Sequence, residues 1–291
     1  KFFDEVERLS GGTVVANRVG GPEVASPLEQ FVPVRDRVFD GGATVGAYHT
    51  NITTLGLGDN LAANYHANKD NFTPRVECGL FEATDAAYNK LGVKFVGSIA
   101  GGWGARLWTI DKIEKPDFSG QKYRAANMYK PLIENLGGSS VPLSFGEIYT
   151  ALQKNVIDGL YWGGVGALAG KWDEVLKYQY PGSLAGGGGV QILINNDAWA
   201  EMSKKQQEAV TAAVESASAF WTELANDLEI KERAELEKRG VQIVEWDAAD
   251  AAAFQAKYYD LISKDFLLRD IAYGPKIAEA VQCVNKKILG N

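Results

Sequence analysis

The sequence predicts an α/β protein made of two lobes. Apolar runs that favour strands alternate along the chain with amphipathic runs that favour helices, as in α/β folds. Four of the strand candidates follow glycines that would end a preceding helix. These glycines are Gly11-Gly12, Gly41-Gly42, Gly92 and Gly240. With 291 residues, the chain can bury a large core and is long enough for two lobes.

Seven short apolar runs fit buried strands. They cover residues 13–19, 43–48, 93–99, 122–125, 157–162, 190–194 and 241–246. The chain opens with Phe2, Phe3, Val6 and Leu9 at helical spacing, so a helix is expected from its first residues.

Two capping boxes mark further helix starts, one at Ser144 with Glu147 and one at Ser203 with Gln206. The second opens a helical run of roughly 35 residues that reaches Arg239, longer than an ordinary globular helix. Either two kinked helices or one helix that spans both lobes would explain this length. Its apolar face is expected to hold Val210, Ala213, Val214, Ala217, Phe220, Leu224 and Leu228.

Composition argues against several classes of partner. The net charge of −7 disfavours a nucleic acid or an acidic membrane surface. No stretch approaches the roughly 20 apolar residues that cross a bilayer. His49, His66 and the two cysteines lack a metal-ligand spacing, so no metal is expected. Cys78 and Cys283 could form a disulfide or stay separate thiols, and the sequence leaves both open.

One block, residues 117–162, carries the strongest functional signal. It reads as strand, helix, strand, helix, strand, and Arg124 stands at the end of the first strand. Arginine is always charged, and its planar guanidinium group fits a carboxylate at two points. Open α/β folds place small ligands where strand ends meet helix starts. The block therefore predicts a receptor for a small organic anion.

Two linked motifs in this block are specific. They are DFSGQKYR at residues 117–124 and PLSFGEIYTALQ at residues 142–153, which leads to Asp158-Gly159. Together they resemble the core of the solute-binding proteins of tripartite ATP-independent periplasmic (TRAP) transporters, the DctP-like family. Weaker agreement extends from LSGGTV at residues 9–14 to QILINNDAW at residues 191–199 and the long helix after it.

The resemblance implies an α/β, two-lobed, periplasmic-binding-protein-like fold with a hinge and a long helix spanning both lobes. Residues 1–103 and 188–227 are expected to form lobe I, and residues 104–187 and 228–291 to form lobe II. Family members have a strand before the first helix, so this strand and a leader are expected to be missing from the sequence. The expected location is periplasmic. No heptad seam is visible, and a monomer is expected.

The resemblance also implies a function, that of a receptor and not an enzyme. It would capture a small carboxylate for the membrane permease subunits of an ion-gradient-driven TRAP transporter, without a cofactor. A sensor-linked binding protein is one alternative. An α/β oxidoreductase is another, because GVGALA at residues 164–169 fits the G-x-G-x-x-A pattern. That motif lacks the acidic residue expected about 20 positions later.

Three polar side chains of lobe II are candidates to bind the ligand's carboxylate. The resemblance implies that Arg124 clamps it and that Arg106, after a glycine-rich turn, assists. A solvated hinge arginine is the alternative for Arg106. Asn127 would either cap a helix that starts near Met128 or donate to a ligand oxygen.

Aromatic residues are expected to cover the apolar part of the ligand. The counterpart of Phe145 in the family packs against the ligand, and core packing is the alternative. Many acid-binding members carry D-G-q-E-N-P where this chain has DGLYWG at residues 158–163. Tyr161 and Trp162 replace a polar pair with flat apolar area, and are expected to sandwich the ligand with Phe145. An aromatic or apolar carboxylate, or a short 2-oxo or 2-hydroxy acid, would fit.

Lobe I should contribute polar contacts from the end of its strand at residues 43–48. Tyr48 and His49 are the candidates there, and a purely structural histidine is the alternative for His49. Glu23, in the turn GGPE at residues 20–23, is expected to reach the cleft or to stay on the surface.

Overall fold

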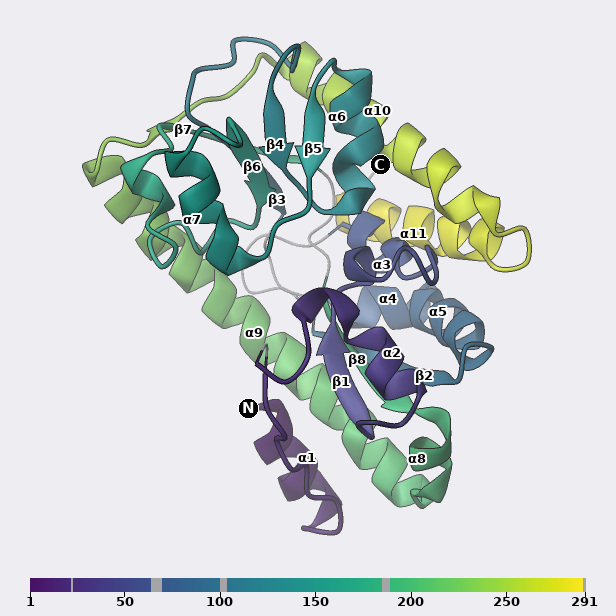
Figure 1. The fold of residues 1–291 in the computed structure, drawn as a ribbon. Coiled ribbons are helices and arrows are strands. Elements are labelled where there is room, and N and C mark those ends of the chain that lie inside the picture. The colour runs from purple at the N-terminus through teal and green to yellow at the C-terminus, as the bar shows by residue number, and fades with distance from the viewer. Residues whose placement is uncertain (22, 64–69, 100–103, 185–188, 290–291) are drawn as a thin grey trace.

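The computed structural model describes residues 1–21, 23–63, 70–99, 104–184 and 189–289. Figure 1 shows two lobes, each with its own sheet, and helix α9 running along one side of the molecule from one lobe to the other. The predicted fold class, two α/β lobes with a long helix spanning both, is therefore confirmed.

The sheet of lobe I has three strands in the order β1-β8-β2, and both pairings are antiparallel. Its strands are β1 (Gly41–Thr44), β8 (Val190–Asn195) and β2 (Val93–Ile99). Lobe II has a mixed six-stranded sheet in the order β5-β4-β6-β3-β7-β9. Its strands are β5 (Ser139–Val141), β4 (Lys122–Arg124), β6 (Gly159–Trp162), β3 (Ala105–Thr109), β7 (Tyr178–Leu184) and β9 (Gln242–Ile243).

The helices pack around these sheets. The α-helices are α1 (Phe2–Ser10), α2 (Phe31–Arg35), α3 (Leu57–Leu61), α4 (Thr73–Glu77), α5 (Leu80–Asn89), α6 (Lys130–Asn135), α7 (Phe145–Gln153), α8 (Asn196–Glu201), α9 (Lys204–Lys238), α10 (Ala248–Asp265) and α11 (Gly274–Leu289). Short 3₁₀ turns are η1 (Pro27–Glu29), η2 (Gly46–Tyr48), η3 (Asn127–Tyr129), η4 (Trp172–Glu174) and η5 (Leu267–Arg269). None of the helices described here is both long enough and apolar enough to cross a membrane.

Not every expected strand forms. Residues 13–19 are not a strand, and Val15 and Val19 are exposed there, because no strand in the described part of the chain pairs with this segment. The run at residues 43–48 is a strand only as far as Thr44 and then becomes the 3₁₀ turn η2. Strands β3 and β7 were not expected, and both pair with partners far away in the sequence.

Both predicted capping boxes are present, at Ser144 and Ser203. The box at Ser203 starts α9, which is one continuous helix of 35 residues. The first part of its expected apolar face is buried, from Val210 to Ala217. Phe220 is 46% exposed, which the helical pattern did not predict.

The C-terminal helix departs from the expected division into lobes. Residues 274–289 were expected in lobe II, but α11 packs against α3, α4 and α5 of lobe I. Its apolar stripe, with Ile277, Val281 and Val284, is buried in that contact. Cys78 and Cys283 form a disulfide that joins α11 to the end of α4. Helix α10 remains with lobe II, where it packs against α6 and β7.

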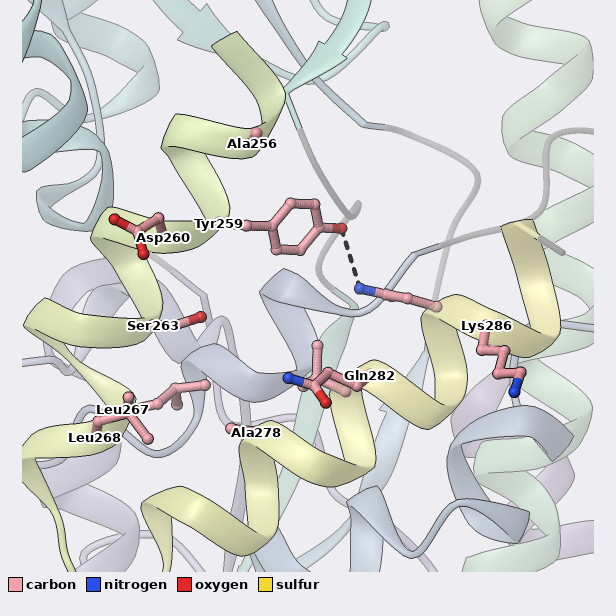
Figure 2. A pocket seen from close by; sticks show the side chains of 11 residues that line it. Ala256, Tyr259, Asp260, Ser263, Leu267, Leu268, Ala278, Gln282 and Lys286 are labelled. Carbon is pink, nitrogen blue, oxygen red and sulfur yellow. Dashed lines mark hydrogen bonds between the residues drawn. The ribbon is translucent and has the colours of Figure 1, made fainter. Parts of the chain in front are cut away.

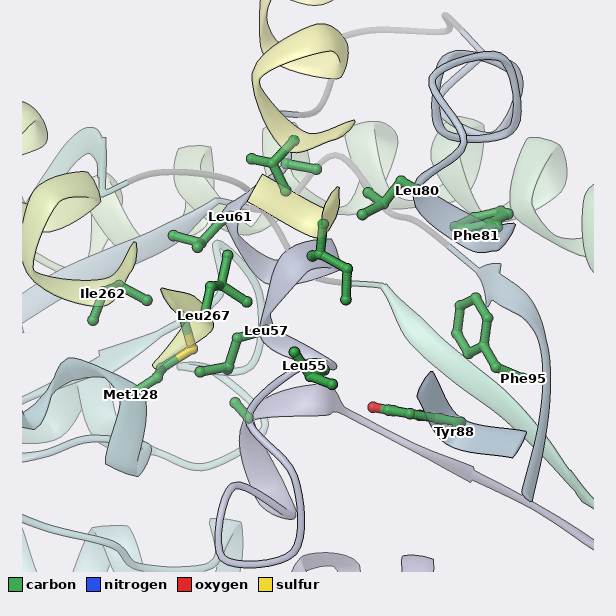
Figure 3. Packing of buried hydrophobic residues seen from close by; sticks show 14 of the residues in the cluster. Leu55, Leu57, Leu61, Leu80, Phe81, Tyr88, Phe95, Met128, Ile262 and Leu267 are labelled. Carbon is green, nitrogen blue, oxygen red and sulfur yellow. The ribbon is translucent and has the colours of Figure 1, made fainter. Parts of the chain in front are cut away.

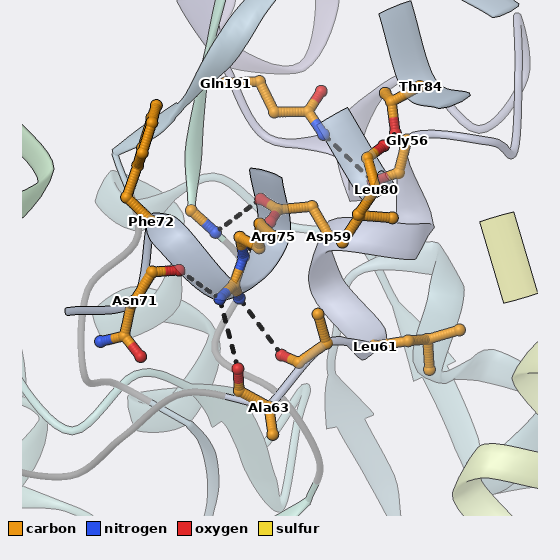
Figure 4. Close-up of polar contacts among 12 residues, drawn as sticks. Gly56, Asp59, Leu61, Ala63, Asn71, Phe72, Arg75, Leu80, Thr84 and Gln191 are labelled. Atoms are coloured by element: carbon orange, nitrogen blue, oxygen red, sulfur yellow. Dashed lines mark hydrogen bonds and ion pairs between the residues drawn. The ribbon is translucent and has the colours of Figure 1, made fainter. Parts of the chain in front are cut away.

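A continuous cluster of buried apolar side chains includes residues of both lobes. Figure 3 shows Met128 of η3 close to Leu57 of α3 and Leu267 of η5, and all three side chains are buried. A buried ion pair joins α4 to α3. Arg75 Nε donates to Asp59 Oδ1 over 2.7 Å (Figure 4). The second oxygen of Asp59 accepts from the backbone nitrogen of Gly189, where the chain re-enters lobe I.

Candidate functional site

Arg124 lies at the end of β4, between the parallel neighbours β5 and β6. Its side chain is 5% exposed. Nε donates to the carbonyl oxygen of Leu143 over 2.9 Å, and Nη1 donates to that of Tyr161 over 3.1 Å. The guanidinium carbon lies 4.4 Å from the centre of the Trp162 ring. The guanidinium group is therefore held in one orientation from two sides.

Arg124 carries a charge that the residues described by the structure leave without an acidic partner. Across the described ranges, no carboxylate forms an ion pair with it. Burial lowers the pKa of Arg124, and the hydroxyl of Tyr48 opposes this shift by hydrogen bonding. A buried charge is costly unless it is paired, so an anion at this position would stabilise the site. Because Tyr48 belongs to lobe I, Arg124 stands where the two lobes meet.

Aromatic rings form a cluster beside the guanidinium group. The ring centroids of Phe145 and Trp162 lie 5.7 Å apart, and Trp172 lies 5.0 Å and 5.3 Å from them respectively. Phe145 is 41% exposed at the start of α7, whereas Trp172 is fully buried beneath the other two. A Cβ atom at Gly166 would lie 3.1 Å from Trp162 Nε1, so a small residue suits this close approach. Sequence analysis missed Trp172, although it is an isolated tryptophan in a polar segment.

The pleat of the sheet separates Tyr161 from this cluster. Residues along a strand alternate between the two faces of the sheet, so adjacent Tyr161 and Trp162 point to opposite sides. The Tyr161 ring is 1% exposed and stacks on Tyr129 at 5.1 Å in the core. The structure therefore does not bring the Tyr161 ring together with Phe145 and Trp162. Only its carbonyl oxygen contacts Arg124.

Arg106 lies directly across from Trp162 in the β3–β6 pairing, so both side chains share one face. It is 7% exposed and is not a solvated hinge arginine. Its Nε donates over 2.9 Å to Glu229, which comes from the spanning helix α9. One turn later in α9, Glu232 accepts from the backbone nitrogens of Gly166 and Leu168. Sequence analysis did not identify Glu229, because nothing local marks it.

His49 lies in the core of lobe I. It is 2% exposed, and its Nε2 lies 2.7 Å from the hydroxyl of Tyr88. That hydroxyl donates to Gln191 over 3.0 Å, and Gln191 in turn donates to the carbonyl of Gly56. Burial lowers the pKa of His49 to about 4. This environment matches the structural alternative for the histidine.

The two remaining candidates are exposed. Asn127 begins the turn η3, whose N-cap is Ala126, and Tyr129 is the N-cap of α6, so the expectation that Asn127 caps the helix is wrong. Glu23 accepts a hydrogen bond from the backbone nitrogen of Gly21 over 2.8 Å, within its own turn. Backbone hydrogen bonds lower the pKa of Glu23. No described contact joins Glu23 to Arg124.

A groove lies away from these residues, between α10 and α11 (Figure 2). This groove has a volume of about 620 Å³, and the Tyr259 hydroxyl and Asn285 amide meet in it at 3.2 Å. It contains none of the predicted site residues. Among the residues with described positions, no group of acidic, histidine or cysteine side chains could hold a metal ion.

The comparisons with known proteins agree with this architecture. Residues 1–267 match the family described as bacterial extracellular solute-binding protein, family 7 (DctP). The chain belongs to this family of TRAP solute-binding proteins, which are substrate-binding receptors of transporters.

Two curated relatives are 30% identical over parts of the chain. One is a solute-binding protein of Roseobacter denitrificans, aligned over 50% of this chain and 44% of the relative. The other is a monocarboxylate 2-oxoacid-binding periplasmic protein of Nostoc sp., aligned over 45% of this chain and 38% of the relative. The chain thus spans less than half the length of these two relatives.

A solved structure supports the fold over the full length. The TRAP periplasmic solute-binding protein of Desulfovibrio salexigens, solved with bound orotic acid, superposes with a TM-score of 0.83 at 20% identity. The superposition covers 99% of this chain and 93% of that one.

Proposed function

We propose that this protein is a periplasmic receptor that captures one small organic acid on Arg124 and delivers it to the permease subunits of an ion-gradient-driven TRAP transporter. The observation that carries the proposal is the buried Arg124 guanidinium group, which has no acidic partner among the described residues. Its remaining donor capacity suits a carboxylate. The proposed receptor is a monomer that carries no cofactor and catalyses no reaction.

The aromatic cluster sets the proposed character of the ligand. Trp162 and Phe145 offer flat apolar area beside the guanidinium group. An aromatic or apolar carboxylate would pack on them, and so would a short 2-oxo or 2-hydroxy acid. The Nostoc relative, which is named for 2-oxoacid binding, supports the second class.

Ligand capture would involve closure of the lobes about a hinge. Tyr48 from lobe I meets Arg124 from lobe II, so the site is complete only when the lobes approach one another. We assign residues 104–184 and 228–265 to lobe II, and we place α11 with lobe I because of its packing. A ligand that binds both lobes would favour the closed form.

The oxidoreductase alternative loses its main support. In the GVGALA motif, the backbone nitrogens of Gly166 and Leu168 already donate to the carboxylate of Glu232, over 2.9 Å and 3.1 Å. A dinucleotide phosphate would need such donors for itself and would be repelled by this glutamate. A sensor-linked receptor would use the same lobes, and a co-purifying partner would distinguish it from a transporter receptor.

The test is a thermal-shift screen of organic acids, followed by calorimetric titration of the best ligand into the Arg124→Ala and Arg124→Lys variants. A ligand at 100 times its Kd should add about 2.7 kcal/mol to stability. Both variants should lose more than about tenfold in affinity, or about 1.4 kcal/mol. The exposed Arg233→Lys variant serves as the control and should bind as wild type does. Affinity within tenfold for Arg124→Ala would disprove the clamp, and a response to nucleotides alone would favour an enzyme.

A further inference from the structure

The two arginines of the site differ in their charge partners. Arg106 forms an ion pair with Glu229, whereas no carboxylate in the described part of the chain pairs with Arg124, which donates to two carbonyl oxygens and lies over the Trp162 ring. Arg106 and Glu229 together carry no net charge. Among these residues, Arg124 therefore contributes a positive charge that no described carboxylate balances.

Arg124 and Arg106 lie on different strands of the lobe II sheet. Strands β4 and β3 flank β6, so Arg124 and Arg106 lie on either side of Trp162. Neighbouring strands are about 4.8 Å apart, and Arg106 pairs with Trp162 two residues beyond Leu160, the partner of Arg124. The two arginine backbones are therefore about 12 Å apart. Two unpaired arginines at this spacing would suit a ligand with a carboxylate at each end. Glu229 removes that possibility at the Arg106 end.

Glu229 is held firmly in this position. Its side chain is only 17% exposed, and Glu232 fixes the next turn of α9 to the loop after β6. A Cβ atom at Gly164 would lie 2.6 Å from Glu229 Oε1, so a larger residue there would require the Glu229 side chain to shift. The Arg106–Glu229 pair thus joins β3 to α9, and the loop after β6 packs against it.

We propose that Glu229 is a specificity-determining residue that restricts the receptor to acids with one carboxylate. This inference rests on the proposed function. The ligand's carboxylate lies on Arg124, and its other end lies near the neutral Arg106–Glu229 pair. A second carboxylate there would face the negative charge of Glu229, and like charges brought together oppose binding.

Matched pairs of acids test the inference, because the members of each pair differ only in a terminal methyl group or carboxylate. Suitable pairs are butyrate with succinate, 2-oxovalerate with 2-oxoglutarate, and 4-methylbenzoate with terephthalate. Calorimetry on the wild-type protein should show a preference for the monoacid of the pair that binds. Glu229→Gln should shift the affinity ratio at least tenfold toward the diacid. The exposed Glu223→Gln on the same helix should leave the ratio unchanged.

Two further variants keep the test decisive if Glu229→Gln does not fold. Arg106→Met leaves the charge of Glu229 unbalanced and should weaken diacid binding further. The double variant Arg106→Met/Glu229→Gln restores neutrality and should return the ratio toward that of the wild type. Ratios that stay within twofold of wild type in all of these variants would overturn the inference. If no member of any pair binds to the wild-type protein, the proposed function fails for these acid classes instead.

Discussion

The guanidinium carbon of Arg124 lies 4.4 Å from the centre of the Trp162 ring, so the cation sits over an aromatic face. The electron-rich face attracts the cation, and the contact strengthens when both groups are shielded from water. Two carbonyl oxygens hold the same guanidinium group from its edges. The arginine is thus held in one orientation, and in the proposed receptor this would reduce the entropy lost on ligand binding.

Trp162→Leu should weaken binding of the organic acid by roughly 2- to 30-fold, which corresponds to about 0.5–2 kcal/mol for a cation–π contact of this kind. The leucine keeps apolar volume but removes the aromatic face under Arg124. Trp162→Phe should have a smaller effect, because it retains a ring. Calorimetric titration of the ligand identified by the screen measures both. Phe220→Leu, at an exposed aromatic residue of α9, is the matched control. Unchanged affinity in Trp162→Leu would show that the ring does not support the clamp.

Loss of the Cys78–Cys283 disulfide should lower the free energy of unfolding by roughly 2–5 kcal/mol. The bond closes a loop with a sequence separation of 205 residues, so it strongly restricts the unfolded chain. It also fastens α11 to lobe I. Urea unfolding with and without a thiol reductant measures the effect.

The double variant Cys78→Ala/Cys283→Ala serves as the control for the reductant, since its unfolding midpoint should not change when reductant is added. Equal stability of the oxidised and reduced wild-type protein would mean that α11 is held by its apolar stripe alone.

Local signals predicted the elements that depend on local chemistry. The capping box at Ser203 predicted the start of α9, and the apolar run after Gly92 predicted β2. Residues 13–19 have similar strand-forming composition, but strand formation requires a partner in space. No strand among the described residues pairs with them. Strand β3 shows the converse, because the glycine-rich sequence before Arg106 favoured a loop, whereas distant strands pair with residues 105–109.

The sequence marked individual candidate residues of the site through local motifs, but it did not predict the contacts among them. A local motif marked Arg124 as a candidate, but its environment comes from segments far apart in the chain. The ion pair between Arg106 and Glu229 joins residues 123 positions apart, and no local pattern reports it. The placement of Tyr161 was predictable, because two adjacent residues of a strand cannot both face one ligand. When two adjacent residues of a strand are both candidates to contact one ligand, the alternation of side chains between the two faces of the sheet allows only one of them to do so.

Between pH 6.5 and pH 4, stability should fall because His49 is buried in its neutral form. Burial lowers its pKa from 6.5 to about 4 in the folded protein, so the unfolded chain binds a proton in this range while the folded protein does not. The full difference corresponds to roughly 3 kcal/mol of unfolding free energy, present above pH 6.5 and lost as the pH falls toward 4. Urea unfolding at pH 7 and pH 4.5 should show a smaller loss for His49→Gln than for wild type. His66 is present in both proteins, so any effect of its titration on stability cancels in the comparison. Equal losses in the two proteins would mean that His49 takes up its proton without unfolding.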